Sequence, residues 1–209
     1  MPINFRQKNI LITGGSGMVG RNFIENKLSK NYHLIAPTKK ELNLLDFEKV
    51  NSFISRNKID FILHTAGKVG GIQANIREPL LFLQENAEMG KNIVLAAKKQ
   101  KIKHLINLSS SCIYPKNIGI PLKENFVLTG PLEPTNEGYA IAKIAGLKLC
   151  SYLYKEHNKD FITIMPTNLY GPNDNFSEMD SHVIPALIHK MHKAKEQEKS
   201  DFFIWGTGK

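Results

Sequence analysis

The stretch NILITGGSGMVG, residues 9–20, decides the fold of this chain. Its first part, Asn9–Thr13, is a short apolar run of the kind that forms a buried β-strand. Apolar residues then recur with a helical period from Met18 to Leu28. The glycines between the two elements fit two spacings, either Gly14, Gly17 and Gly20 or Gly15, Gly17 and Gly20. Such a turn lets a pyrophosphate approach the N–H groups at a helix N-terminus, so it predicts a dinucleotide site. The alternative is a glycine-rich turn without a ligand.

Strand-like and helix-like segments alternate along the rest of the chain. Strands are expected at His33–Ala36, Phe61–His64, His104–Leu108 and Phe161–Met165. Helices are expected at Phe47–Arg56, Pro79–Gln100, Glu137–Glu156 and Val183–His192. This alternation predicts an α/β fold with a doubly wound, Rossmann-like parallel sheet that helices cover on both faces. We expect a dinucleotide-binding domain at residues 1–168 and an incomplete second subdomain at 169–209, with a strand in the terminal FFIWGTGK.

The composition restricts the classes of function. The 209-residue chain carries a formal net charge of +9, which favours either an anionic partner or a solvated basic surface. Its densest basic cluster, Lys98–Lys103, lies where a helix should end and contains no aromatic residue, so we expect no nucleic-acid partner. Cys112 and Cys150 are the two cysteines and indicate neither a disulfide framework nor a metal site. Without a signal peptide or membrane-spanning run, the chain is expected to be cytoplasmic and without a membrane partner.

The segment after the second expected strand predicts which dinucleotide is bound. NAD sites place an acidic residue there for the ribose 2′-hydroxyl, whereas basic residues accommodate a 2′-phosphate. Here Lys39 and Lys40 come first, and no acidic residue occurs before Glu41. We therefore expect NADP(H), with Lys39 or Lys40 near the phosphate. The alternative is that both lysines are ordinary surface residues.

Tyr139 and Lys143 are four residues apart in the expected helix Glu137–Glu156, so they share one helix face. We expect the ammonium to stabilise the phenolate and lower the pKa of Tyr139 toward neutrality. The phenol could then exchange a proton with a carbonyl or alcohol oxygen while a hydride moves. Ser109–Ser111 follow the strand His104–Leu108, at the end where α/β sheets place ligands. Together these residues predict redox catalysis.

The ordered set Gly14–Gly20, Ser110, Tyr139 and Lys143 resembles the extended short-chain dehydrogenase/reductases. Further stretches make the chain similar to one branch of that family, the GDP-L-fucose synthases. These stretches are HTAGKVGGI (64–72), SSCIYPK (110–116), PLEPTNEGY (131–139), PTNLYGPND (166–174), SHVIPAL (181–187) and WGTG (205–208). The resemblance covers nearly the whole chain.

The resemblance implies a two-stage conversion of GDP-4-keto-6-deoxy-D-mannose to GDP-L-fucose. Cys112 and His182 would be the acid/base pair for epimerisation at carbons 3 and 5. Tyr139 and Ser110 would then serve NADPH-dependent reduction at carbon 4, and Lys143 would also hold the nicotinamide ribose. Cofactor contacts are implied for Gly14, Gly17, Met18, Val19, Gly20, Ala66, Gly67, Lys143, Pro166, Asn168, Leu169 and His182. Substrate contacts are implied for Asn168, Lys190 and Trp205.

Several alternatives remain open. Without the resemblance, Cys112 is more often a small buried residue and His182 a helix cap or a solvent-facing side chain. The sugar could be another GDP-4-keto sugar, such as a 6-deoxyheptose or a 3,6-dideoxy sugar precursor, or the chain could be a non-catalytic dinucleotide-binding module. The family continues for roughly another hundred residues, so we expect a C-terminally truncated chain. The resemblance also implies a homodimer formed through the helices Pro79–Gln100 and Glu137–Glu156.

Overall fold

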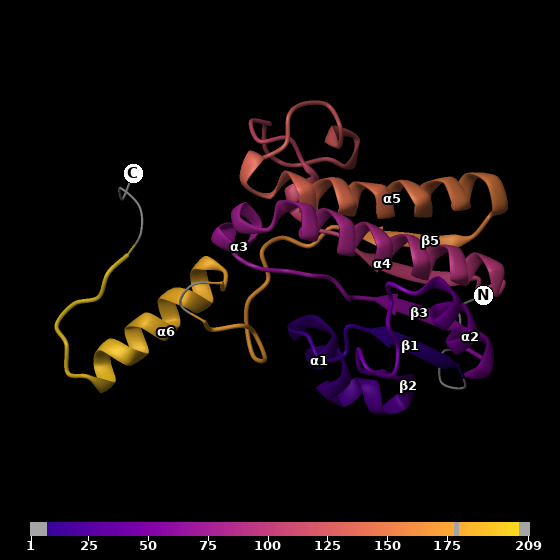
Figure 1. Cartoon of the computed structure of the whole chain (residues 1–209), viewed down its shortest axis with the longest axis horizontal. Coiled ribbons are helices and arrows are strands. Elements are labelled where there is room, and N and C mark those ends of the chain that lie inside the picture. Colours follow the sequence, from indigo (N-terminus) through magenta and orange to yellow (C-terminus); the bar gives the residue numbers. More distant parts are fainter. Residues whose placement is uncertain (1–7, 178–179, 205–209) are drawn as a thin grey trace.

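A five-stranded parallel sheet forms the centre of the protein in the computed structural model, which describes residues 8–177 and 180–204 (Figure 1). Its strands are β1 (Asn9–Thr13), β2 (His33–Ile35), β3 (Phe61–His64), β4 (His104–Leu108) and β5 (Asp160–Ile164). They lie in the order β2-β1-β3-β4-β5, and all neighbours are parallel. The strand order reverses beside β1, which is where a doubly wound sheet opens a crevice at the carboxyl ends of its strands. The predicted α/β, Rossmann-like fold is confirmed.

Three of the helices begin or end at residues suited to a helix terminus. The helices are α1 (Met18–Glu25), α2 (Phe47–Arg56), α3 (Ile72–Arg77), α4 (Pro79–Lys99), α5 (Glu137–His157) and α6 (Val183–Glu196). The carboxylate of Asp46 caps α2 by accepting a hydrogen bond from the Lys49 N–H at 3.1 Å. Pro79 occupies the first turn of α4, where its missing N–H does no harm. Asn158 ends α5 in the left-handed region with a φ of 48°.

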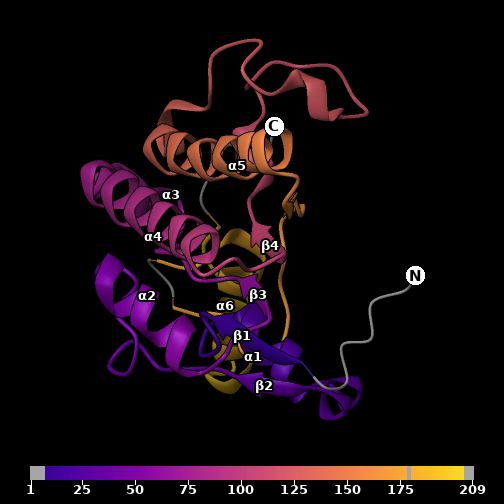
Figure 2. The ribbon, with the colours of Figure 1, turned by 90° about the vertical axis from the view of Figure 1, so that its right-hand side faces the viewer.

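The hydrophobic core lies between the sheet and the layer formed by α2, α4 and α5. Figure 2 shows α2 and α4 on the same side of the sheet, with α5 beside α4. Fully buried side chains from every part of this layer meet there, among them Leu11, Ile54, Ile62, Ile93 and Leu105. Cys150 of α5 is also buried in this cluster. Burial of this apolar surface is the main favourable term that fixes the carboxyl ends of the strands relative to α5.

The second face of the sheet is less covered than the sequence predicts. β1 is buried along most of its length, but β3, β4 and β5 alternate between buried and more exposed residues. Ile162 and Ile164 of β5 are 57% and 45% exposed. Within residues 8–177 and 180–204, α4 and α5 pack on β4 and β5 from one face of the sheet. The expectation that helices cover both faces is therefore wrong for β5 in the described part of the chain.

Three other expectations also differ from the structure. The expected helix Met18–Leu28 stops at Glu25, because the Asn26 side chain accepts the Leu28 N–H at 2.9 Å and starts a 3-10 helix, η2 (Lys27–Asn31). The helix α3 was not expected, since six residues are too short to show a period. Residues 201–204 form no strand, and residues 205–209 lie outside the described residues. Phe203 is 87% exposed and pairs with no sheet edge, so the expectation of a strand there is wrong for these residues.

Candidate active site

The glycine turn after β1 is packed directly against the segment that follows β3. Gly14 has a φ of 77°, and its carbonyl accepts the Gly17 N–H at 3.0 Å. A Cβ atom at Gly14 would lie 2.6 Å from the backbone nitrogen of Ala66, and one at Gly20 would overlap the Gly14 carbonyl. Gly15 packs elsewhere, toward the Ala36 side chain beyond β2. Of the two possible spacings, the structure therefore builds the turn from Gly14, Gly17 and Gly20.

The N-terminus of α1 fits a diphosphate. Gly17 is its N-cap residue, and no side chain caps the helix there. The N–H groups of Met18, Val19 and Gly20 form its first turn, where backbone donors and the helix dipole favour an anion. The predicted phosphate-binding turn thus has the required backbone geometry.

The segment after β3 joins the glycine turn to Lys143. The backbone and side chain of Thr65 both donate to the Thr13 carbonyl, at 3.1 Å and 2.7 Å. Two residues later, a Cβ atom at Gly67 would lie 3.0 Å from the Asn86 Oδ1 and 3.5 Å from the Lys143 Nζ. The ends of β1 and β3 and the middle of α5 therefore meet at Ala66–Gly67.

Tyr139 and Lys143 lie together on the face of α5 that turns toward β4. The Lys143 Nζ donates to the Leu108 carbonyl at 3.0 Å and lies 5.5 Å from the centre of the Tyr139 ring. The ring of Phe82 meets the Tyr139 ring edge to face, with the centroids 6.5 Å apart. Burial lowers the pKa of Lys143 to about 8, because an apolar environment disfavours the charged form.

The expected lowering of the Tyr139 pKa is wrong for this structure. Burial of the phenol raises its pKa well above the usual value, and the nearby Cys112 raises it further. Helix spacing places the ammonium beside the phenol but does not reveal the desolvation of the phenol, which here has the larger effect on its pKa. Tyr139 is consequently protonated at neutral pH and retains a proton that it can donate.

Ser110 and Cys112 complete the cluster from the end of β4. Ser110 caps the short 3-10 helix η3 (Ser111–Ile113), and its Oγ accepts the Cys112 N–H at 3.3 Å. Burial raises the pKa of the Cys112 thiol, although the Ser110 hydroxyl and the Lys143 charge partly oppose this effect. Since η3 packs against α5, the fold brings Ser110, Cys112, Tyr139 and Lys143 together.

Two buried asparagines that the sequence reasoning missed position this cluster. Asn107 of β4 donates to the Thr163 Oγ1 at 3.3 Å, and a Cβ atom at Gly146 would lie 3.3 Å from its Nδ2. The small residue at Gly146 thus lets α5 approach β4 one turn beyond Lys143. Asn86 of α4 accepts the Lys68 N–H at 2.9 Å and donates to the Lys68 carbonyl at 3.0 Å. The sequence signal that could have identified Asn107 and Asn86 is the presence of a polar residue within an otherwise apolar strand or helix.

A buried histidine was missed as well. The Nδ1 of His64 lies 2.7 Å from the Oγ1 of Thr13, which ties the last residues of β3 and β1 together. Burial lowers the pKa of His64 to about 3, and the Lys143 charge acts in the same direction. His64 is therefore neutral at neutral pH and adds no second positive charge beside Lys143.

The loop after β5 crosses from the cluster to α1. At its start the Ser111 N–H donates to the Pro166 carbonyl at 3.1 Å. Near its end the Asn22 Nδ2 of α1 donates to the Pro172 carbonyl at 2.6 Å. Asn168 and Leu169 lie between these two anchors and are exposed. Their backbone therefore runs along the same carboxyl edge of the sheet as the other expected contacts.

Lys39 and Lys40 are exposed in the turn that follows β2. Glu41 does not project from this turn, because its carboxylate accepts the Thr38 N–H at 2.7 Å and the Thr38 hydroxyl at 2.9 Å. These hydrogen bonds lower the pKa of the Glu41 carboxyl. The nearest acidic residue is thus bonded within its own turn, while both lysines face solvent.

The residues expected from the C-terminal part of the chain are placed only in part. His182 is the N-cap residue of α6 and is exposed. Among the described residues, no hydrogen bond or ion pair joins it to the Ser110–Lys143 cluster. The Lys190 Nζ donates to the Phe203 carbonyl at 3.3 Å. Trp205 lies outside the described residues.

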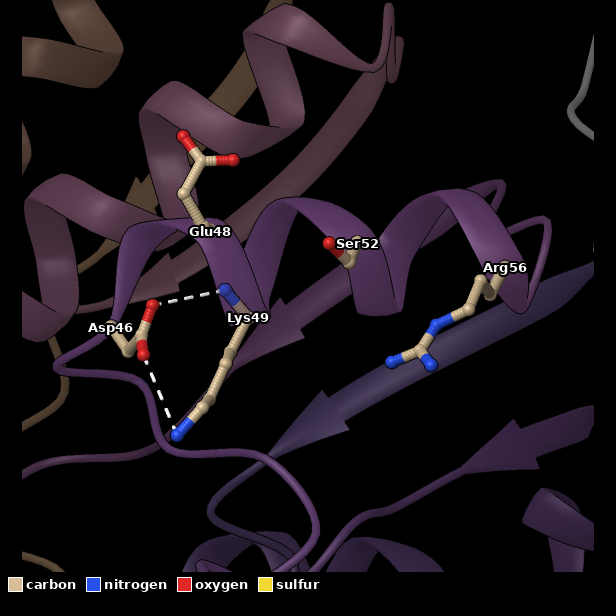
Figure 3. Close-up of a pocket in the computed structure, with 5 residues that line it drawn as sticks. All are labelled: Asp46, Glu48, Lys49, Ser52 and Arg56. Atoms are coloured by element: carbon tan, nitrogen blue, oxygen red, sulfur yellow. Dashed lines mark hydrogen bonds and ion pairs between the residues drawn. The ribbon is translucent and has the colours of Figure 1, made fainter.

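A separate hollow lies on the surface of α2 and contains none of the expected residues. Asp46, Glu48, Lys49, Ser52 and Arg56 line it, and Lys49 forms an ion pair with Asp46 at 3.5 Å (Figure 3). All of its lining comes from one helix and its cap, so no strand end contributes to it. Its side chains are charged groups and one hydroxyl, and none of them belongs to the cluster at the strand ends.

Neither a metal cluster nor a membrane helix is found in the part of the chain that the structure describes. No group of three or more His, Cys, Asp or Glu side chains within it is arranged to hold a metal ion. None of its helices combines the length and the apolar character needed to cross a membrane.

Curated proteins of two specificities are similar to this chain. A GDP-L-colitose synthase from Yersinia pseudotuberculosis is 49% identical over 95% of this chain and 65% of its own length. A GDP-L-fucose synthase from Azorhizobium caulinodans is 48% identical over 96% of this chain and 64% of its own length. The chain therefore spans somewhat less than two thirds of the length of these relatives.

Solved structures show the same fold. A GDP-D-glycero-L-gluco-heptose synthase from Campylobacter jejuni, crystallised in the presence of NADPH, superposes with a TM-score of 0.86 at 28% identity. The superposition covers 97% of this chain and 68% of the other. Residues 10–209 also match the NAD dependent epimerase/dehydratase family. Because that match runs from β1 to residue 209, this chain belongs to the NAD dependent epimerase/dehydratase family.

Proposed function

We propose that the protein converts GDP-4-keto-6-deoxy-D-mannose to GDP-L-fucose by epimerisation at carbons 3 and 5 and NADPH-dependent reduction at carbon 4. The observation that carries this proposal is the gathering of Ser110, Cys112, Tyr139 and Lys143 at the strand ends, next to the glycine turn. The similarity to a GDP-L-fucose synthase at 48% identity supports the choice of substrate.

The glycine turn and its neighbours would hold the dinucleotide. The first turn of α1, Met18–Gly20, would bind the diphosphate, with Ala66 and Gly67 along the same edge. Lys143 would hold the nicotinamide ribose, and Pro166, Asn168, Leu169 and His182 would lie beside the nicotinamide end. When bound, NADPH supplies the hydride for the reduction. Exposed Lys39 and Lys40 would bind the 2′-phosphate as point charges.

We predict that replacing Lys39 and Lys40 together by Ala weakens NADPH binding about 10- to 100-fold and leaves NADH binding within about twofold. The reason is that both ammonium groups would serve only the 2′-phosphate. Fluorescence titration of the reduced nicotinamide with both dinucleotides measures the two affinities. A wild-type chain that binds NADH much more tightly than NADPH would contradict the cofactor assignment.

In the reduction, Tyr139 would donate its phenolic proton to the carbonyl oxygen at carbon 4. Its raised pKa keeps that proton in place at neutral pH. Ser110, at the end of β4, would donate a hydrogen bond to the same carbonyl oxygen. The ammonium of Lys143 would stabilise the phenolate that remains until solvent returns a proton.

In the epimerisation, one of Cys112 and His182 would remove a proton beside the 4-keto group and the other would return one to the opposite side of the ring. The carbonyl makes these protons acidic because the enolate is delocalised. Each stereocentre loses and regains one proton, so the step needs no oxidant. The raised pKa of Cys112 keeps its thiol protonated at neutral pH, which suits the group that returns the proton.

Two substitutions separate the two stages. We predict that Cys112→Ser largely keeps reduction but lowers epimerisation at least about 100-fold, because the hydroxyl is a much weaker acid. Tyr139→Phe should show the reverse, with reduction lowered by a similar factor and NADPH binding retained. The measurements are deuterium uptake from solvent at carbons 3 and 5 without NADPH, and NADPH oxidation with substrate.

Unchanged deuterium uptake in Cys112→Ser would remove Cys112 from its role. Full NADPH oxidation by Tyr139→Phe would contradict the reductase proposal itself. Cys150→Ser is the matched control, since Cys150 is buried in the core and touches neither reaction in this account.

Burial of Lys143 also predicts a pH-dependent stability. Its pKa is lowered from 10.5 to about 8, so between these values the unfolded chain binds more protons and stability rises with pH. At pH 7 the buried charge costs on the order of 3 kcal/mol. Lys143→Met should therefore raise the free energy of unfolding at pH 7 by about 1 to 3 kcal/mol, less what is lost with the Leu108 hydrogen bond.

The gain should shrink as the pH rises from about 8 past 10.5, because the folded lysine is then neutral and the unfolded lysine loses its proton as well. Urea unfolding at pH 7 and at pH 10 measures it. The exposed Lys155 at the other end of α5 gives the control, since Lys155→Met relieves no buried charge. A Lys143→Met chain that is less stable than the wild type at pH 7 would show that the ammonium is stabilising.

A second candidate function is reduction of another GDP-4-keto sugar. The similarity to a GDP-L-colitose synthase favours a 3,6-dideoxy sugar precursor, and the likeness to a heptose synthase favours a GDP-linked keto heptose, such as a 6-deoxyheptose or its 6-hydroxy counterpart. Comparing kcat/KM for the candidate keto sugars with NADPH distinguishes them. A chain that binds NADPH but turns over none of them would be a non-catalytic binding module.

We propose a homodimer formed through α4 and α5, acting in the cytoplasm. The two helices pack side by side and carry exposed apolar side chains, including Leu80, Ile141 and Tyr152. Pairing with a second copy would bury them in a four-helix bundle.

The cysteines agree with the proposed location in the cytoplasm. Cys112 and Cys150 are both free thiols, as is usual in a reducing compartment. Residues 169–209 would contribute to the substrate subdomain.

A further inference from the structure

We propose that Gly71 and Arg77, at the two ends of α3, are positioning residues that hold the segment Asp180–His182 against the nucleotide-binding domain. This inference rests on the proposed function, since it gives His182 its place during epimerisation. Figure 1 shows the start of α6 next to α3, although the rest of α6 points away from the sheet.

The first contact is between backbones. The Gly71 N–H donates to the Asp180 carbonyl at 2.9 Å, across more than a hundred residues of sequence. A Cβ atom at Gly71 would overlap the Ser181 carbonyl oxygen, and one at Gly70 would lie 3.8 Å from the Asp180 carbonyl oxygen. The missing Cβ of Gly71 thus leaves the space in which the Ser181 carbonyl lies, whereas a Cβ at Gly70 would make only an ordinary contact with Asp180.

The second contact is an ion pair at the other end of α3. The Arg77 Nη2 lies 3.1 Å from the Asp180 Oδ1, and the two side chains are 56% and 46% exposed. Such exposed pairs add only about 0.2 to 1 kcal/mol to stability. This pair nevertheless joins the same residue whose carbonyl binds Gly71, so the backbone and side chain of Asp180 are held at once. Two anchors on one residue restrict its position and orientation.

The residues of α3 that hold Asp180 are connected to the surroundings of Tyr139. Glu78 lies 3.8 Å from the Arg77 Nε and 3.1 Å from the Lys68 Nζ, so one carboxylate bridges both cations. The Lys68 Nζ lies 5.3 Å from the centre of the Phe82 ring, and that ring meets Tyr139 edge to face. A continuous series of contacts therefore connects the segment before His182 with the ring of Tyr139.

His182 follows Asp180 by two residues and starts α6, where its carbonyl accepts the Ala186 N–H at 3.1 Å. Its exposed side chain has no hydrogen bond to the Ser110–Lys143 cluster in the described structure, so its backbone anchors decide where it can reach. Loosening Asp180 should reduce the fraction of molecules in which His182 faces the sugar. NADPH affinity should change little, because Met18–Gly20, Ala66 and Gly67 would hold the dinucleotide whether or not Asp180 is anchored.

The experiment uses Arg77→Gln, Asp180→Asn and the double variant of the full chain, with Lys49→Gln as the matched control. Lys49 forms another exposed ion pair, on α2 (Figure 3). In the single variants we expect amide hydrogen exchange in residues 180–186 to become about two- to fivefold faster. We expect the kcat of epimerisation to fall by a similar factor. The double variant should be no worse than either single variant, since both remove one interaction. NADPH affinity should stay within about twofold.

Gly71→Ala should act more strongly than Arg77→Gln, because a Cβ atom there must displace the Ser181 carbonyl. Amide exchange in residues 180–186 that is the same in Arg77→Gln and in wild type would overturn the anchoring. Faster exchange with unchanged epimerisation would overturn the positioning role. If the wild type took up no deuterium at carbons 3 and 5, the proposed function would fail together with this inference, which separates that outcome from a failure of the anchor alone.

Discussion

The burial of the Lys143 ammonium is the constraint around which the rest of the site is arranged. A charge placed among β4, α5 and the segment after β3 is unfavourable, and its pKa near 8 reflects that cost. One hydrogen bond to the Leu108 carbonyl holds it in place. Around it the chain keeps small residues at Gly67 and Gly146 and a neutral histidine at His64. A cation that is buried at a cost in stability is typical of a group that binds a ligand or takes part in catalysis.

Much of the fold follows from the sequence because the signals are local. β1, β3 and β4 coincide with short apolar runs, and α2 was expected with the bounds it has. The glycine turn also has the predicted context, since the strand before it and the helix after it are both contiguous with it. The sequence could not decide between the two glycine spacings, one with Gly14 and one with Gly15. Only tertiary contacts show which backbone each glycine approaches, and they favour the spacing with Gly14.

The proximity of Ser110, Cys112, Tyr139 and Lys143 was predictable from the sequence, but their electrostatics were not. Helix spacing correctly paired Tyr139 with Lys143, yet the direction of the Tyr139 pKa shift depends on burial that spacing does not measure. Asn86 and Asn107 act through contacts with elements far away in sequence. α3 and its ion pair with Asp180 were hidden for the same reason, since neither end of the contact has a distinctive local pattern.

The most direct measurement of the central claim is a crystal structure of the chain with NADPH. The account predicts the diphosphate on the N–H groups of Met18–Gly20 and the nicotinamide within reach of the Tyr139 hydroxyl, with the Lys143 Nζ on its ribose. A dinucleotide bound elsewhere, or a nicotinamide ring remote from Tyr139, would contradict it.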